Sequence, residues 1–117
     1  MGIVYHANYL KYLERARTEY IGDRWSAIEG YHERGCYFMV NKMDIAFHAP
    51  AKLGDLLVIR TSVENSTKFR VVLRQIILKK GEPRDYLVTA RVTLVTVSRN
   101  GELMELPSEF HGQRDGV

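Results

Sequence analysis

The sequence contains one cysteine among 117 residues and no long apolar run. A lone thiol cannot form an internal disulfide, so an oxidising compartment is not indicated. A bilayer-spanning helix needs roughly 20 mostly apolar residues, which this sequence nowhere provides. The first residues also lack the basic and then apolar pattern of a secretory signal. We therefore expect a cytoplasmic protein that does not insert into membranes.

Charge of one sign is not concentrated anywhere in the sequence. The formal net charge is +3, and no block of like charges occurs. This excess is too weak and too dispersed to indicate nucleic-acid binding, but it suits a small polyanionic ligand. The four histidines show no metal-ligand spacing, and neither a serine nucleophile elbow nor a glycine-rich phosphate loop occurs. We expect neither a metal nor a cofactor.

The length suits one domain, covering residues 1–117, and the sequence has no repeats or linkers. Its first predicted element is a helix from Tyr9 to Ile21, capped by Asn8 and ended by Gly22. Steps of three and four residues place one set of side chains on a shared face. That set is Tyr9, Tyr12, Leu13, Ala16 and Tyr20.

A second, shorter helix is predicted from a capping box of Ser26 and Glu29, with Gly35 closing the segment. Cys36 follows, beside three large apolar residues, which favours a buried thiol at the start of a strand over a nucleophile. Alternating apolar and polar residues then predict strands over 43–47, 57–63, 69–78 and 90–94. Turns are predicted at 65–66, 81–83 and 100–101, and the tail from residue 111 is expected to be loose.

Alternating strand and helix units are absent, which argues against a parallel sheet. Strands in series, joined by tight turns, predict an antiparallel sheet that buries the apolar face of the long helix, an α+β fold. Four strands form a small sheet with exposed edges. Either a further strand precedes Met1 or another chain pairs along an edge.

The most informative stretch runs from Gly2 to Arg17 and reads GIVYHANYLKYLERAR. It is a glycine-containing loop that enters a helix, with His6 and Asn8 near the junction. The start of a helix offers unpaired backbone N–H groups and partial positive charge. Such a start can polarise a carbonyl group or hold an oxyanion.

This stretch resembles the signature of the YbgC-type, 4-hydroxybenzoyl-CoA-thioesterase-like branch of the hotdog superfamily. The resemblance continues through residues 47–55, which read FHAPAKLGD, and covers most of the chain to about Pro107. It implies an antiparallel sheet wrapped around the long helix and hydrolysis of acyl-CoA thioesters. It also implies homodimers, often paired into homotetramers, with active sites at the interfaces between subunits.

The resemblance assigns roles to individual residues. The backbone N–H of His6 would polarise the thioester carbonyl, and the His6 side chain would orient substrate or water. The expected substrate-binding residues are Gly2, Val4, Tyr5, Asn8 and Lys68. Lys68 belongs to a turn, residues 65–68, that falls where relatives hold the phosphates of CoA.

The family's catalytic Asp, a general base or nucleophile, lies seven positions before the residue that matches His6. That is two positions before Met1, outside this sequence, and the family's first strand is outside it as well. Two explanations stay open. The chain is N-terminally shortened and the native protein carries the Asp, or the native protein lacks it. We expect the 117-residue form to be nearly inactive.

Other readings compete with these assignments. His6 could simply cap or solvate the helix. Glu14 could be the catalytic acid, although a surface ion pair is the plainer reading, and Asp44 and Asp55 are distant in sequence, with Asp55 in a turn pattern. Lys68, Arg70, Arg74 and Arg91 could form a solvated face instead of phosphate contacts. A non-catalytic acyl-CoA-binding protein with the same fold is the alternative function.

Overall fold

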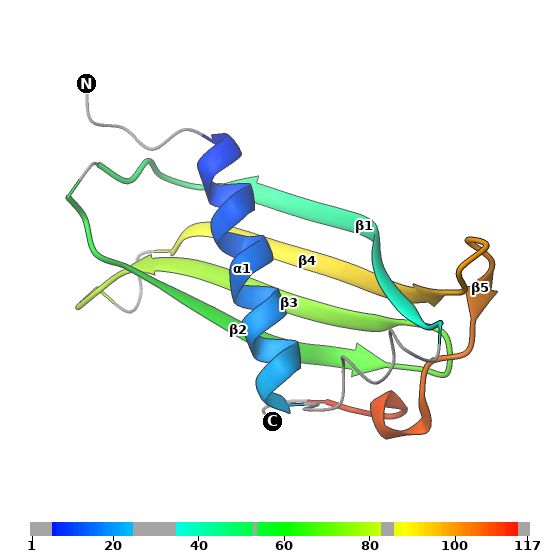
Figure 1. Ribbon diagram of the computed structural model, residues 1–117. Coiled ribbons are helices and arrows are strands. Elements are labelled where there is room, and N and C mark those ends of the chain that lie inside the picture. The colour runs from blue at the N-terminus through cyan, green and yellow to red at the C-terminus, as the bar shows by residue number, and fades with distance from the viewer. Residues whose placement is uncertain (1–5, 25–34, 53, 83–85, 115–117) are drawn as a thin grey trace.

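The computed structural model describes residues 6–24, 35–52, 54–82 and 86–114 as one helix on one face of an antiparallel sheet (Figure 1). The elements are α1 (His6–Arg24), β1 (Tyr37–Phe47), β2 (Leu57–Ser66), β3 (Val71–Lys79), β4 (Tyr86–Val97), β5 (Leu103–Met104) and the 3-10 helix η1 (Ser108–Phe110). The strand order is β1-β4-β3-β2, and the short β5 pairs with β4. The predicted α+β class and the four long strands are confirmed.

The ends of α1 differ from the prediction. The helix begins at His6, so Asn8 lies within its first turn and does not cap it. It also continues through Gly22 to Arg24, since Ile21 is buried against the core and extends the packed face of the helix. Packing of an apolar face outweighs the weak preferences of single capping residues. The predicted second helix, around Ser26 and Glu29, lies outside the described residues.

Strand pairing also departs from a simple series of hairpins. β2 pairs with β3 and β3 with β4, but β1 pairs with β4 instead of β2. The segment after β1 therefore crosses from one edge of the sheet to the other. Within the described residues, β1 and β2 each have one edge without a paired strand.

The turn between β2 and β3 was predicted at Asn65 and Ser66, and this placement is wrong by two residues. β2 runs on through Ser66, and the turn closes where the Thr67 N–H donates to the Arg70 carbonyl over 2.8 Å. A register shift between Val63 and Asn65 places Ser66 opposite Val71. The predicted turn at Asn100 and Gly101 is confirmed, with Gly101 at a φ of 80° that suits glycine.

The core lies between α1 and the inner face of the sheet. It contains apolar residues from the helix and from alternate positions of the inner strands: Tyr9, Leu13, Val63, Leu73, Ile77, Val88 and Val92. The register places Leu73 opposite Val92, so their side chains meet on this face. The outer face carries exposed charged side chains such as Arg74 and Arg91.

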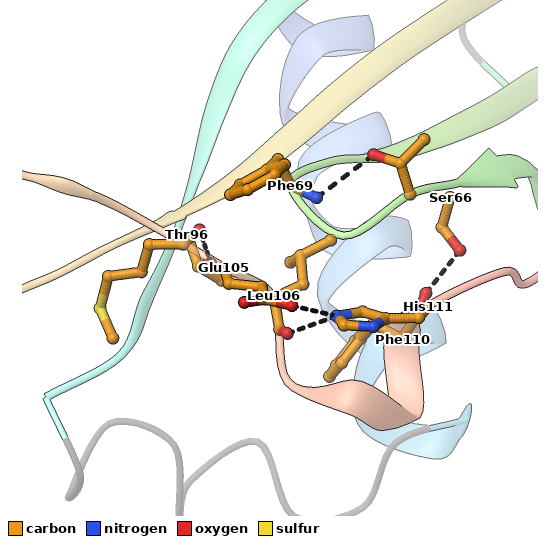
Figure 2. A network of polar contacts seen from close by, with 9 residues as sticks. Ser66, Phe69, Thr96, Glu105, Leu106, Phe110 and His111 are labelled. Atoms are coloured by element: carbon orange, nitrogen blue, oxygen red, sulfur yellow. Dashed lines mark hydrogen bonds and ion pairs between the residues drawn. The ribbon is translucent and has the colours of Figure 1, made fainter.

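His111 and Gln113 make hydrogen bonds to other parts of the chain, so the loose tail predicted from His111 onward is wrong for these residues, while residues 115–117 lie outside the described residues. Residues 103–113, here called the C-terminal strap, bury Phe110 completely against the ring of Phe38. The Ser66 hydroxyl donates to the Phe110 carbonyl (Figure 2). It also accepts a hydrogen bond from the Gln113 N–H. His111 donates through Nε2 to the Leu106 carbonyl over 2.6 Å. The strap is rich in polar residues, but the buried ring of Phe110 anchors it to the rest of the protein.

Candidate functional site

The start of α1 falls at His6, the residue that the sequence placed at the junction of loop and helix. The N–H groups of a helix's first turn have no partner within the helix, and the helix dipole adds partial positive charge there. This end of α1 can therefore accept a carbonyl oxygen or another anionic atom. Gly2, Val4 and Tyr5 lie outside the described residues, as does the side chain of His6.

Tyr9 connects the start of α1 to the sheet. The Ala51 N–H donates to the Tyr9 hydroxyl over 2.8 Å, and both residues are buried. The Tyr9 ring also lies against Phe47, the last residue of β1, with ring centroids 5.8 Å apart. The sequence placed Tyr9 only on the buried face of the helix. The missed signal is that a buried tyrosine hydroxyl needs a hydrogen-bond partner.

A buried polar group holds the middle of α1. Arg17, whose side chain is 7% exposed, donates from Nη1 to Gln75 Oε1 over 3.1 Å. Gln75 is fully buried on β3 and donates to the Leu13 carbonyl over 3.0 Å and to Thr61 Oγ1 over 3.1 Å. Burial lowers the pKa of the Arg17 guanidinium, and the nearby charge of Glu14 partly opposes that shift. Sequence reasoning missed this group.

Lys68 and the start of α1 lie at opposite ends of the sheet within one chain. Lys68 is exposed in the turn that precedes Val71, and Val71 is opposite Leu94 in β4. The contacts of Tyr9 are instead at the other end, where Phe47 is opposite Val88. Six residues of β4 separate these positions, which is about 20 Å of strand. The C-terminal strap braces the turn, because the Leu106 N–H donates to the Lys68 carbonyl over 2.7 Å.

The rival carboxylates have ordinary surroundings. Asp55 closes a turn, accepting from the Lys52 N–H at Oδ2 over 2.7 Å. Asp44 lies exposed on β1, 3.7 Å from the ammonium group of Lys42, and Glu14 is exposed on α1. The predicted turn role of Asp55 is thereby confirmed.

The structure also describes the surroundings of Cys36 and Arg91. Cys36 is a buried thiol immediately before β1, as predicted. Arg91 lies exposed on the outer face and pairs with Glu64 Oε1 over 2.7 Å. The hydrogen bond that Arg91 donates to the Glu64 carboxylate, together with the negative charge of Glu64, raises the pKa of Arg91 above its usual value. Arg91 therefore forms an ion pair on the protein surface, within one chain.

Within the described ranges, no group of three or more His, Cys, Asp or Glu side chains could hold a metal ion. In the same part of the chain, no helix combines the length and apolar character that crossing a membrane requires.

Comparison with known proteins places these features in a family context. The model of the family described as "Thioesterase superfamily" matches residues 1–86. An acyl-CoA thioesterase YbgC from Helicobacter pylori is 45% identical over 74 residues, which cover 63% of this chain and 53% of that protein. An acyl-CoA thioester hydrolase YbgC from Escherichia coli is 35% identical over 74 residues, covering 63% of this chain and 55% of the relative. The chain thus spans about half the length of the curated relatives it matches.

The solved structures include one with substantial sequence identity. A probable thioesterase from Bartonella henselae is 33% identical and superposes with a TM-score of 0.79, over 91% of this chain and 86% of the other. This likeness over most of both chains confirms the predicted hotdog fold.

Proposed function

Given that this chain belongs to the thioesterase superfamily, we propose that it hydrolyses acyl-CoA thioesters to a free acid and CoA. The names of the curated relatives support this activity. The single observation that carries the proposal is the start of α1 at His6, where the family-like motif enters the helix. Helix N–H groups that have no partner within the helix meet the chemical requirement for stabilising a thioester oxygen as it gains negative charge.

In the proposed reaction, the thioester carbonyl oxygen accepts a hydrogen bond from the His6 backbone N–H. A carboxylate supplied from outside this sequence, two positions before Met1, acts as general base and takes a proton from water. The water oxygen bonds to the carbonyl carbon, and the resulting oxyanion is held at the start of α1. The carbon–sulfur bond then breaks, and the CoA thiolate leaves and receives the proton.

The remaining assignments belong to the same proposal. The side chain of His6 orients substrate or water, and Gly2, Val4, Tyr5 and Asn8 line the bound thioester. Because Lys68 lies at the far end of the sheet from His6, we propose that a second copy of the chain brings Lys68 to the CoA phosphates. A homodimer or homotetramer is the assembly that the family resemblance implies, and we propose the cytoplasm as its location.

The test of this function compares the 117-residue chain with an extended form, lengthened by the codons that precede Met1. We expect the extended form to release CoA from acyl-CoA, and its Asp→Asn variant and the 117-residue chain to be nearly inactive. Release of free thiol over a series of acyl chain lengths measures the activity. An extended form that binds CoA but cleaves no acyl-CoA would instead identify an acyl-CoA-binding protein.

Removal of the Lys68 charge is expected to weaken binding of the nucleotide part of the substrate. An exposed charge pair contributes up to about 1 kcal/mol, so Lys68→Ala should raise KM for acyl-CoA by about fivefold at low salt and leave kcat unchanged. The acyl-pantetheine analogue, which lacks the nucleotide phosphates, should show no change in KM.

Arg74→Ala is the matched control, because Arg74 is also an exposed cation but lies on the outer face of β3. Its KM for acyl-CoA should match that of the unchanged protein. If Lys68→Ala raised KM equally for acyl-CoA and acyl-pantetheine, Lys68 would not contact the phosphates of CoA.

A further inference from the structure

We propose that Tyr9 is a positioning residue, whose hydroxyl fixes the place of the α1 start relative to the sheet. This inference rests on the proposed thioesterase function, because it concerns the helix end that would hold the thioester oxygen. Tyr9 does not touch the reacting atoms in this account. It acts through the backbone of the first helical turn.

Tyr9 lies close to the start of α1. Tyr9 lies three residues after His6, which corresponds to about 4.5 Å along the helix axis. A contact at Tyr9 therefore constrains the first turn more directly than any contact further along α1. A further hydrogen-bonded connection between α1 and the sheet is made by Gln75, which bonds the Leu13 carbonyl about one turn beyond Tyr9 and Arg17 about two turns beyond it.

The contact between Tyr9 and Ala51 is directional. Apolar packing sets the spacing between helix and sheet, but the hydrophobic effect has no directional preference. A hydrogen bond, in contrast, has a preferred distance and angle. The 2.8 Å bond from the Ala51 N–H to the Tyr9 hydroxyl therefore limits rotation and sliding of α1 where apolar contact alone does not.

Ala51 belongs to a segment that is itself held by hydrogen bonds. The N–H groups of His48 and Ala49 both donate to the Leu87 carbonyl in β4, over 2.8 and 3.3 Å. Next in the chain, the Lys52 N–H is held by the carboxylate of Asp55. Hydrogen bonds on both sides of Ala51, joined by the short backbone of residues 48–52, thus connect β4 to the first turn of α1. Pro50, between these contacts, restricts the backbone further.

This geometry makes a quantitative prediction for Tyr9→Phe in the extended form. The substitution retains the buried ring and its contact with Phe47 but removes the hydroxyl. A displacement of about 1 Å at a reacting centre can lower a rate about 100-fold. We expect kcat for acyl-CoA to fall about 10- to 100-fold and KM to stay within about twofold, because the nucleotide contacts are elsewhere.

Tyr12→Phe is the matched control. It removes the same atom from the same helix, but Tyr12 is 39% exposed and lies outside the Ala51 contact. Both variants are assayed well below their unfolding temperatures, so that each is fully folded. Equal kcat values for Tyr9→Phe and the unchanged protein would overturn the inference, as would equal losses in the two variants.

Amide hydrogen exchange provides a readout that does not depend on activity. In Tyr9→Phe, the amides of Ala51 and of the second turn of α1 should exchange faster, while amides in β3 and β4 keep their rates. Unchanged exchange at Ala51 would contradict the positioning role even if the protein proved not to be a thioesterase. Altered exchange in a protein that cleaves no acyl-CoA would instead reject the proposed function and leave Tyr9 as the fixed point of the helix.

Discussion

His6→Pro is expected to lower kcat of the extended form on acyl-CoA by about 100- to 1,000-fold, the usual cost of losing one oxyanion donor. Proline removes the backbone N–H at this position and nothing else that the helix requires. His6 is the first residue of α1, where the N–H makes no bond within the helix and the fixed φ of proline fits. The variant should therefore remain folded, and rates of free thiol release should report the loss of the donor.

His6→Ala is the matched variant, because it retains the N–H and removes the imidazole. We expect it to fold and to lose about tenfold in kcat, less than the roughly 100-fold or more that a general acid or base contributes, because the imidazole only orients substrate or water. The difference between the two variants isolates the backbone donor. If alanine and proline lowered kcat equally, the N–H of His6 would have no part in the reaction.

Gln75→Leu is expected to destabilise the fold by about 2–4 kcal/mol, because it leaves a buried charged donor and a buried carbonyl group without their hydrogen-bond partners, at about 1–3 kcal/mol each. The side chain of Gln75 is fully buried and holds three partners at once. Leucine fills much of the same space but leaves the Arg17 guanidinium without its amide acceptor and the Leu13 carbonyl without its donor. Urea unfolding of both proteins measures the difference in free energy of unfolding.

Two further proteins make this test specific. Arg74→Leu, on the neighbouring exposed position of β3, should change the free energy of unfolding by no more than about 0.5 kcal/mol. The double variant Arg17→Met with Gln75→Leu should be more stable than the sum of the two single effects, since no charge is then left buried without a partner. Additive effects would show that the two side chains do not depend on each other.

The sequence was sufficient where structure follows from local pattern. The helix around Tyr9 to Ile21 follows from the spacing of its apolar residues, and the four long strands follow from alternation. The turn at Asn100 and Gly101 follows from the preference of glycine for a positive φ. The candidate site at the start of α1 could be predicted because its residues are contiguous in the sequence.

The sequence was insufficient where structure depends on contacts between distant segments. The pairing of β1 with β4 is non-local, and alternation within a strand does not specify which strand lies beside it. Gln75 reads as a polar residue in a largely apolar strand, and its burial is explained by partners from distant segments, Arg17 and the Leu13 carbonyl of α1 and Thr61 of β2. Phe110 likewise becomes an anchor only because Ser66 and Phe38 meet it from elsewhere in the chain.

A crystal structure of the extended form with a non-hydrolysable acyl-CoA analogue tests the central claim most directly. Our account predicts that the analogue's carbonyl oxygen accepts a hydrogen bond from the His6 N–H, at about 2.7–3.1 Å. Its nucleotide phosphates should lie beside Lys68 of a second subunit. A carbonyl group bound away from the first turn of α1 in the assembled oligomer would contradict the account.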